Sequence, residues 1–353
     1  MDGRFERVDK NFLIATKIEK EGLCFYDIEK SPFKIHGIFK EDGVFRRIPS
    51  SVARSVSEGV YNLHTHAAGG RVRFVSDSPY VAIKVEYVPT RMPHFALSGS
   101  AGFDMYSGYN NEIRYEGTFV PPLDVTHGYE SVKDFSNEHE RIITINFPLY
   151  STVTKLYIGL KEGSSLKEAP SYKVEKPVVY YGSSITQGGC ASKPSSTYQS
   201  ILSRKFNCDF INLGFAGNAR GEKEITDYIK NLDMSIFVLD YDHNAPSLEH
   251  LKNTHQVMFQ EIRKANPNLP IIIMNRPKYY LTKEEKQRYD VIYATYMSAK
   301  EQGDKNVYFL SNEKLMEIAL DNGTVDNCHP TDFGYFSMAN ALEEVFKEIL
   351  SKL

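Results

Sequence analysis

A serine in a glycine-rich turn is the first residue of this 353-residue chain that could do chemistry. Ser184 lies in the segment YGSSITQGG, residues 181–189, at the end of the apolar stretch 178–183. A sharp turn from a strand into a helix would expose the serine hydroxyl and aim the backbone N–H of the same residue at an oxyanion. The alternative is a serine and glycine loop that only caps a helix.

An aspartate and a histidine near the C-terminus could activate that serine. Asp326 and His329 stand in the short segment DNCHPT, residues 326–331. An aspartate three residues before a histidine can bring its carboxylate to Nδ1 of the imidazole. That contact fixes the tautomer and leaves Nε2 free to accept a serine proton. A single histidine before a proline is more often a structural residue, but its combination with the other segments favours a catalytic pair.

Two further segments contain groups that could stabilise an oxyanion. Gly217, in NLGFAGNA (residues 212–219), would let the backbone approach a reacting carbonyl and point an N–H at it. Asn244, in LDYDHNA (residues 239–245), could donate a hydrogen bond from its side-chain amide to the same oxygen. The alternatives are an ordinary turn at Gly217 and an asparagine that only shapes the turn before Pro246.

The second half of the chain contains the elements that must position these residues. Apolar stretches alternate there with amphipathic helical patterns, and stretches such as IFVLD are apolar on both faces, as in a parallel sheet covered by helices. The expected strands are 178–183, 209–215, 235–241, 270–275 and 307–311, and the expected helices lie near 197–206, 222–230, 248–265, 283–301 and 332–350. This pattern predicts a doubly wound α/β fold with a five-stranded parallel sheet. Functional side chains gather at the carboxyl ends of such strands, so we expect the four segments to meet there.

The first half has a different periodicity. Short stretches that alternate polar and apolar residues are separated by Gly, Pro, Asn and Asp, which predicts an antiparallel sandwich without long helices. The expected strands are 33–39, 71–76, 80–87, 95–106, 113–120, 141–148 and 154–160. A linker-like stretch, 161–176, separates the two patterns. We therefore expect two domains, a sandwich over 1–170 and an α/β domain over 171–353.

Composition and charge exclude several classes of function. The chain is 41% hydrophobic and 25% charged, with a net charge of −3, which is typical of a globular protein without the basic excess of a nucleic-acid binder. No apolar run approaches the roughly 20 residues that span a bilayer. The first ten residues, MDGRFERVDK, lack the apolar core of a secretory signal. We expect no nucleic-acid or membrane partner and a cytoplasmic location, unless a signal peptide has been removed.

The cysteines and the remaining histidines do not predict a metal site. Cys24, Cys190, Cys208 and Cys328 are scattered without the spacing of a zinc site or a disulfide framework, so we expect reduced thiols. His64 and His66 have the spacing of a strand pair, but no adjacent carboxylate or cysteine completes a ligand set, and we predict no metal. Cys190 and Cys328 lie near the predicted catalytic residues, but neither occupies the turn that would expose Ser184.

Taken together and in this order, the four segments resemble the SGNH (GDSL-type) hydrolase superfamily. The resemblance covers about half the chain, from roughly Val178 to the C-terminus. One residue departs from the name-giving motif: Ser183 precedes the nucleophile where the motif has an aspartate. A subset of the superfamily carries GSSIT at this place.

This resemblance implies a role for five residues and no cofactor. Ser184 matches the nucleophile, and Asp326 and His329 match the acid and the base. Gly217 and Asn244 match two donors of the oxyanion hole, beside the backbone N–H of Ser184. The implied reaction passes through an acyl-enzyme and needs no metal, because a base rather than a Lewis acid activates the serine.

The segment GFDMY, residues 102–106, resembles the Gly-x-Asp-Leu-Tyr signature of a β domain that precedes SGNH domains in some bacterial esterases. Several such two-domain proteins are carbohydrate acetylesterases, so the resemblance implies a jelly-roll-like sandwich and an acetylated oligosaccharide or polysaccharide as substrate. Tyr106 and Arg276 are candidate substrate contacts, although Tyr106 could be partly core and Arg276 could be an ion-pair residue. Alternatives are a lipase or acyl-thioesterase of the same fold and a non-catalytic glycan-binding protein, and the sequence leaves a homo-oligomer open.

Overall fold

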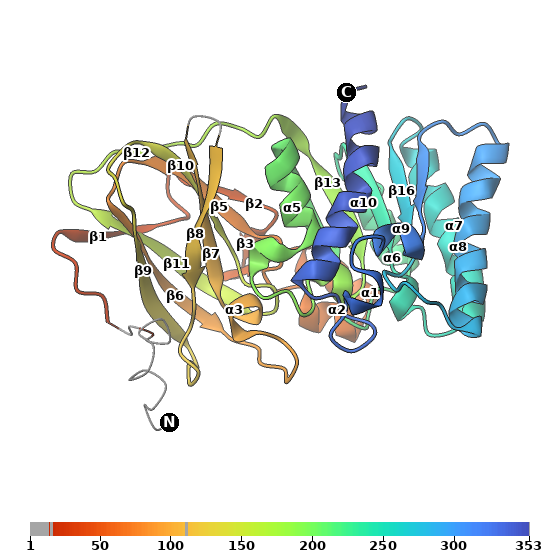
Figure 1. The fold of residues 1–353 in the computed structure, drawn as a ribbon, viewed down its shortest axis with the longest axis horizontal. Coiled ribbons are helices and arrows are strands. Elements are labelled where there is room, and N and C mark those ends of the chain that lie inside the picture. Colours follow the sequence, from red (N-terminus) through yellow and green to blue (C-terminus); the bar gives the residue numbers. More distant parts are fainter. Residues whose placement is uncertain (1–13, 15–16, 110–111, 353) are drawn as a thin grey trace.

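The computed structural model describes residues 14, 17–109 and 112–352 of the chain, which form two halves side by side along the long axis of the molecule (Figure 1). The first half is a sandwich of two antiparallel sheets, as predicted. One sheet has the order β1 (Leu23–Asp27), β11 (Thr152–Lys161), β6 (Tyr80–Val88), β9 (Gly128–Asp134). The other has the order β12 (Leu166–Lys167), β5 (Arg71–Ser76), β10 (Arg141–Asn146), β7 (Phe103–Tyr109), β8 (Glu112–Phe119), with β2 (Lys34–His36) also pairing with β5.

The alternation of apolar and polar residues along the strands explains why two sheets pack face to face. Val81, Ile83 and Val85 of β6 are buried between the sheets, whereas Lys84 and Glu86 are exposed. Because successive side chains of a strand point to opposite faces, each sheet has one apolar face, and the two apolar faces pack together.

One predicted strand of the first half was wrong. The stretch 95–106 contains a short helix, α3 (Leu97–Ser100), and β7 begins only at Phe103. Ser98, Gly99 and Ser100 have low strand propensity. A Cβ at Gly99 would collide with the carbonyl oxygen of Ala191, so this turn packs directly on the backbone of the second half.

The second half is the predicted α/β domain. Its five parallel strands have the order β14 (Cys208–Gly214), β13 (Val174–Gly182), β15 (Ile236–Asp240), β16 (Ile271–Met274), β17 (Val307–Leu310). The core on one face contains residues of α5 (Tyr198–Phe206), α9 (Asn312–Leu315) and α10 (Asp332–Leu350). The core on the other face contains residues of α6 (Lys223–Ile229), α7 (Leu248–Ala265) and α8 (Lys283–Glu301). The prediction of a helix-covered parallel sheet is confirmed.

Two short helices from the first half belong to the packing of the second. After the hairpin of β3 (Phe39–Glu41) and β4 (Val44–Arg46), α1 (Ser50–Val56) and α2 (Glu58–Leu63) contribute to the core shared by α6, α7 and α8. Arg47 holds this segment against the α/β domain. It donates to the carbonyl oxygens of Asn212 (3.2 Å) and Leu63 (2.8 Å), and its guanidinium lies 4.7 Å from the ring centre of Phe215. The two halves therefore share a core and form one body.

No helix in the described part of the chain combines the length and the apolarity that crossing a bilayer requires.

Candidate active site

The turn that contains Ser184, the predicted nucleophile, follows directly from the end of β13 (Val174–Gly182). Ser183 is the N-cap of α4 (Ser184–Gln187), and its hydroxyl accepts a hydrogen bond from Ile185 N at 3.1 Å. A Cβ at Gly182 would collide with the carbonyl oxygen of Asp240, so only glycine allows this close approach of β15. Ser183 thus supplies the capping oxygen at the position where the name-giving motif has aspartate, and the turn leaves Ser184 partly exposed.

The structure brings Ser184, His329 and Asp326 into one hydrogen-bonded chain. Ser184 Oγ lies 2.9 Å from His329 Nε2, and His329 Nδ1 lies 2.7 Å from Asp326 Oδ2. Asp326 Oδ1 accepts from the backbone N–H groups of His329 (2.7 Å) and Cys328 (3.1 Å). This is the arrangement in which a carboxylate orients an imidazole and the imidazole accepts a serine proton.

Asp326 is held as a carboxylate. Burial by itself would raise the pKa of Asp326, but hydrogen bonds from the backbone and ring of His329, together with charge on that ring, lower this pKa below its usual value. The side chain therefore stays an acceptor for the imidazole N–H at neutral pH.

Gly217 and Asn244 lie on loops that follow β14 and β15. Gly217 has φ +71°, a backbone conformation that favours glycine. Asn244 ends the short helix η3 (Asp242–Asn244), and its Oδ1 accepts a hydrogen bond from Ala219 N at 3.3 Å. The amide group Nδ2 is the donor of this side chain, and the contact of Oδ1 with the Gly217 loop leaves Nδ2 to face an oxyanion.

The sandwich supplies part of the site, which the sequence reasoning missed. The loop between β6 and α3 places the His94 ring 5.6 Å and the Phe95 ring 6.2 Å from the His329 ring. His94 Nε2 is 3.7 Å from Asp326 Oδ2. Phe95 packs edge-on against Tyr150, whose hydroxyl donates to the carbonyl oxygen of Ser184 at 3.1 Å. An aromatic wall from the first half therefore borders the proposed base.

Gln187 connects the nucleophile helix to both halves. Its Oε1 accepts from Ala216 N at 3.1 Å, beside Gly217, and its Nε2 lies 3.1 Å from His66 Nδ1 and 3.2 Å from the carbonyl oxygen of Leu149. Burial lowers the pKa of His66 to about 3, so this imidazole is neutral and acts as a structural hydrogen-bonding group.

Both halves of the chain match known families. Residues 175–347 match the GDSL-like Lipase/Acylhydrolase family, and residues 23–166 match GxDLY, the N-terminus of Esterase_SGNH_hydro-type. The protein is a GDSL-type hydrolase.

Solved structures similar to this GDSL-type hydrolase share both halves of its fold. A putative GDSL-like lipase from Bacteroides ovatus is 25% identical with a TM-score of 0.83, covering 93% of this chain and 98% of its own. The salicylyl-acyltransferase SsfX3 of a tetracycline biosynthetic pathway is 18% identical with a TM-score of 0.74, and the match covers 94% of this chain and 98% of the acyltransferase. A family two carbohydrate esterase from Cellvibrio japonicus is 12% identical with a TM-score of 0.60, and the match covers 93% of this chain and 98% of the esterase. No curated protein sequence gives a significant match.

The cysteines near the triad of this GDSL-type hydrolase are poor nucleophiles. Burial raises the pKa of the Cys190 thiol to about 12 and that of the Cys328 thiol to about 11, so both stay protonated at neutral pH. Among the described residues, one trio could hold a metal ion, because the ligand atoms of His94, Cys190 and His329 lie within 4.8 Å of one another. That trio includes the proposed base, so a bound ion there would compete with proton transfer from Ser184.

Replacing Asn244 with alanine is expected to lower the turnover of the hydrolase by about 10²- to 10³-fold and to leave the fold intact, because one oxyanion donor is lost. Measurement of kcat beside a thermal unfolding curve separates the two effects. Wild-type turnover in the variant would remove Asn244 from the oxyanion hole.

Arg276 lies in an ion-pair network beside η3, the alternative that the sequence left open, and its predicted contact with substrate stays a prediction. Its guanidinium is buried and donates to both carboxylate oxygens of Asp242 (2.8 and 2.9 Å) and to Glu285 (2.9 Å). Arg288 donates to the same Asp242 at 2.8 Å and to the carbonyl oxygen of Ala245 at 2.9 Å. Three of the five N–H donors of Arg276 are engaged in this network, so Arg276 supports the η3 turn and, with it, Asn244.

Replacing Asp242 with asparagine is expected to lower the free energy of unfolding by about 3–5 kcal/mol, because the buried Arg288 loses its carboxylate and the buried Arg276 keeps only Glu285. Burial by itself would raise the pKa of Asp242, but hydrogen bonds and charge from Arg276 and Arg288 lower it to about 2. This pKa lies below the value of about 3.9 for an unfolded aspartate, so the stabilisation is present above that pH and is lost as the pH falls.

Urea unfolding of the wild type and Asp242→Asn measures the difference between their free energies of unfolding. We expect this difference to be largest at neutral pH and to become smaller below about pH 4. Asp290→Asn, an exposed change on α8, is the matched control and is expected to unfold like the wild type. Equal stability of the wild type and Asp242→Asn at neutral pH would contradict the prediction.

Tyr106 packs on a residue of α5, and its predicted contact with substrate stays a prediction. Its ring centre is 4.3 Å from the Arg204 guanidinium, and it lines a cavity between the two halves whose lining includes no residue of the triad. Its neighbour Asp104, from the GFDMY segment, accepts from Asn146 Nδ2 at 2.6 Å and from Ser195 N at 2.8 Å. This segment thus connects the sandwich to the loop that follows the nucleophile helix.

Proposed function

We propose that this GDSL-type hydrolase is a serine esterase that removes short acyl groups, acetyl first among them, from carbohydrate. The observation that carries the proposal is the continuous chain from Ser184 Oγ through His329 to the Asp326 carboxylate. A polarised serine hydroxyl beside two further oxyanion donors is the machinery of acyl transfer.

The proposed reaction has two halves. His329 Nε2 takes the proton from Ser184 Oγ as that oxygen attacks the acyl carbon, and the N–H groups of Ser184, Gly217 and Asn244 hold the resulting oxyanion. His329 then protonates the departing sugar alcohol as the carbon–oxygen bond breaks, which leaves an acyl-serine. A water molecule, deprotonated by His329, attacks the acyl-serine, and the carboxylic acid leaves as Ser184 regains its proton.

Two observations support carbohydrate as the alcohol. The half-buried Phe95 ring stands beside the His329 ring, and an aromatic face is a suitable support for a sugar ring. A family two carbohydrate esterase has the same two-part fold.

The test is hydrolysis of a chromogenic ester series from acetate to octanoate, followed by acetate release from acetylated oligosaccharides. We expect the highest kcat/KM for acetate and a fall as the chain lengthens. A maximum at octanoate would favour a lipase or acyl-thioesterase instead. No turnover by the folded protein on any ester or acetylated oligosaccharide would favour the non-catalytic glycan-binding alternative.

A further inference from the structure

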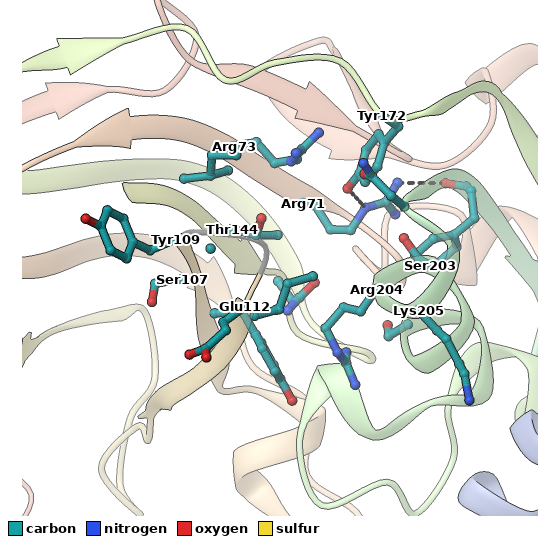
Figure 2. Close-up of a pocket in the computed structure, with 18 residues that line it drawn as sticks. Arg71, Arg73, Ser107, Tyr109, Glu112, Thr144, Tyr172, Ser203, Arg204 and Lys205 are labelled. Carbon is teal, nitrogen blue, oxygen red and sulfur yellow. Dashed lines mark hydrogen bonds between the residues drawn. The ribbon is translucent and has the colours of Figure 1, made fainter. Parts of the chain in front are cut away.

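A cavity lies between the two halves, away from Ser184, Asp326 and His329. It encloses about 560 Å³ between the β5–β10–β7–β8 sheet of the sandwich and the α5–β14 segment of the α/β domain (Figure 2). The α/β side is formed by residues of α5, by the C-cap Asn207 of that helix, and by Phe210 near the beginning of β14. Ser184 follows the opposite, carboxyl end of the neighbouring β13, so this cavity is distinct from the proposed active site.

Strand alternation explains why charged groups line the sandwich side. Val72 and Phe74 of β5 point into the sandwich core, so Arg71 and Arg73 point outward towards the α/β domain. Thr144 of β10 lies on the same outward face. Arg204 and Lys205 of α5 belong to the lining on the other side (Figure 2).

Two of the four cations in this lining are matched by carboxylates. Arg71 pairs with Asp209, and Lys205 pairs with Glu343. The one lining carboxylate, Glu112, pairs with Arg114 at 2.5 Å.

The other two cations have no carboxylate in contact, although the charge of Asp209 acts on Arg73 and that of Asp104 acts on Arg204 from farther away. Among the described residues, neither Arg73 nor Arg204 forms an ion pair. Arg73 is only 6% exposed, donates to the carbonyl oxygen of Pro170 at 3.1 Å and lies 4.0 Å from the ring centre of Tyr172. Arg204 donates to the carbonyl oxygen of Ser195 at 2.9 Å and stacks on Tyr106.

A buried guanidinium without an anion is energetically unfavourable. Each guanidinium has five N–H donors, and the contacts of Arg73 and of Arg204 each include one protein acceptor. Stacking on tyrosine offsets part of the desolvation cost, but an aromatic face does not accept the in-plane N–H groups. Burial lowers the pKa of both arginines from its usual value, as expected for cations in a protein-lined space. An anion in the cavity would accept the remaining hydrogen bonds.

We propose that this cavity binds an acidic sugar, whose carboxylate or phosphate lies against Arg73 and Arg204. The volume is within the range of small-molecule sites, and the lining combines the Tyr172 ring with the Thr144 hydroxyl, which suits a ring that bears hydroxyl groups. Since none of the triad residues lines the cavity, binding here is independent of ester hydrolysis.

Isothermal titration calorimetry on the full chain tests the proposal with four probes: a uronic acid disaccharide, glucose 6-phosphate, inorganic phosphate and neutral xylobiose. We expect an acidic sugar to bind, with an affinity that falls as salt is raised, and xylobiose not to bind. Binding of the uronate alone identifies a carboxylate ligand, and binding of the sugar phosphate alone identifies a phosphate ligand. Ser184→Ala is expected to bind as the wild type does, which separates this site from the proposed esterase.

Arg204→Gln and Arg73→Gln are each expected to raise Kd at least tenfold, because each removes a charge-assisted contact. Arg73 is the more buried, so Arg204→Gln keeps the test open if Arg73→Gln does not fold. Arg54→Gln is the matched control, since Arg54 also stacks on a tyrosine, Tyr61, but lies on α1 and outside the cavity lining. The proposal is overturned if neither acidic sugar binds, if only inorganic phosphate binds, if xylobiose binds equally well, or if both folded variants keep the wild-type affinity.

Discussion

Replacing Ser184 with alanine is expected to lower kcat/KM for an acetyl ester by about 10⁴- to 10⁶-fold. The variant keeps the oxyanion donors and the general base, but it has no oxygen to form the acyl-enzyme. The turn itself is expected to persist, because its capping oxygen comes from Ser183 and its close approach to β15 depends on Gly182. The loss is therefore expected in the chemical step and not in stability.

Steady-state hydrolysis of the chromogenic acetate, together with a thermal unfolding curve, measures both quantities. Cys190→Ala is the matched control, because Cys190 is the thiol beside His329, and we expect it to retain activity. If Ser184→Ala stayed within tenfold of the wild type while Cys190→Ala lost activity, the nucleophile would be the thiol.

Replacing Asp326 with asparagine is expected to lower kcat by about 10⁴-fold. Asp326 accepts from Nδ1 of His329 and from two backbone N–H groups, so the carboxylate fixes both the loop and the tautomer. An asparagine can keep the backbone contacts through its oxygen, but its NH₂ group would then face Nδ1. This favours the tautomer whose Nε2 carries the proton and cannot accept another from Ser184.

Comparison of kcat for the wild type, Asp326→Asn and Asp321→Asn measures this effect. Asp321 is exposed in the same C-terminal region, and its hydrogen-bond partner is the adjacent Asn322, so the control tests the loss of a carboxylate outside the triad. A loss of less than tenfold in Asp326→Asn would show that another group orients His329. The neighbouring His94 ring would then be the next residue to replace.

The α/β half could be predicted from sequence because its signals are local. Strands such as β15 and β16 are fully buried and apolar, and a turn, a helix and then the next strand follow in regular order. The nucleophile, the oxyanion loops and the Asp326–His329 segment each follow a strand or precede a helix, so their meeting point follows from the topology of a parallel sheet. The roles of these residues stay predictions until the variants are measured.

What could not be predicted depends on contacts between residues far apart in the chain. Strand β9 contains Glu130, Ser131 and Lys133 and buries only Tyr129 fully, so its sequence reads as a polar loop, and its pairing with β6 decides its structure. His94 and Phe95 reach His329 only because the sandwich packs beside the sheet. No spacing in a single sequence encodes such a juxtaposition. The predicted domain boundary at 170 and the cytoplasmic location also stay predictions.

The helices α1 and α2 have a consequence for how this protein can be divided. They come early in the chain, before most sandwich strands, yet Ala53 and Val60 are buried in the α/β core. A fragment starting near residue 171 would lack these helices and Arg47, and would present bare hydrocarbon to water. We therefore expect that the α/β half does not fold when it is expressed alone. A functional chimera of two such proteins would need both halves from the same parent.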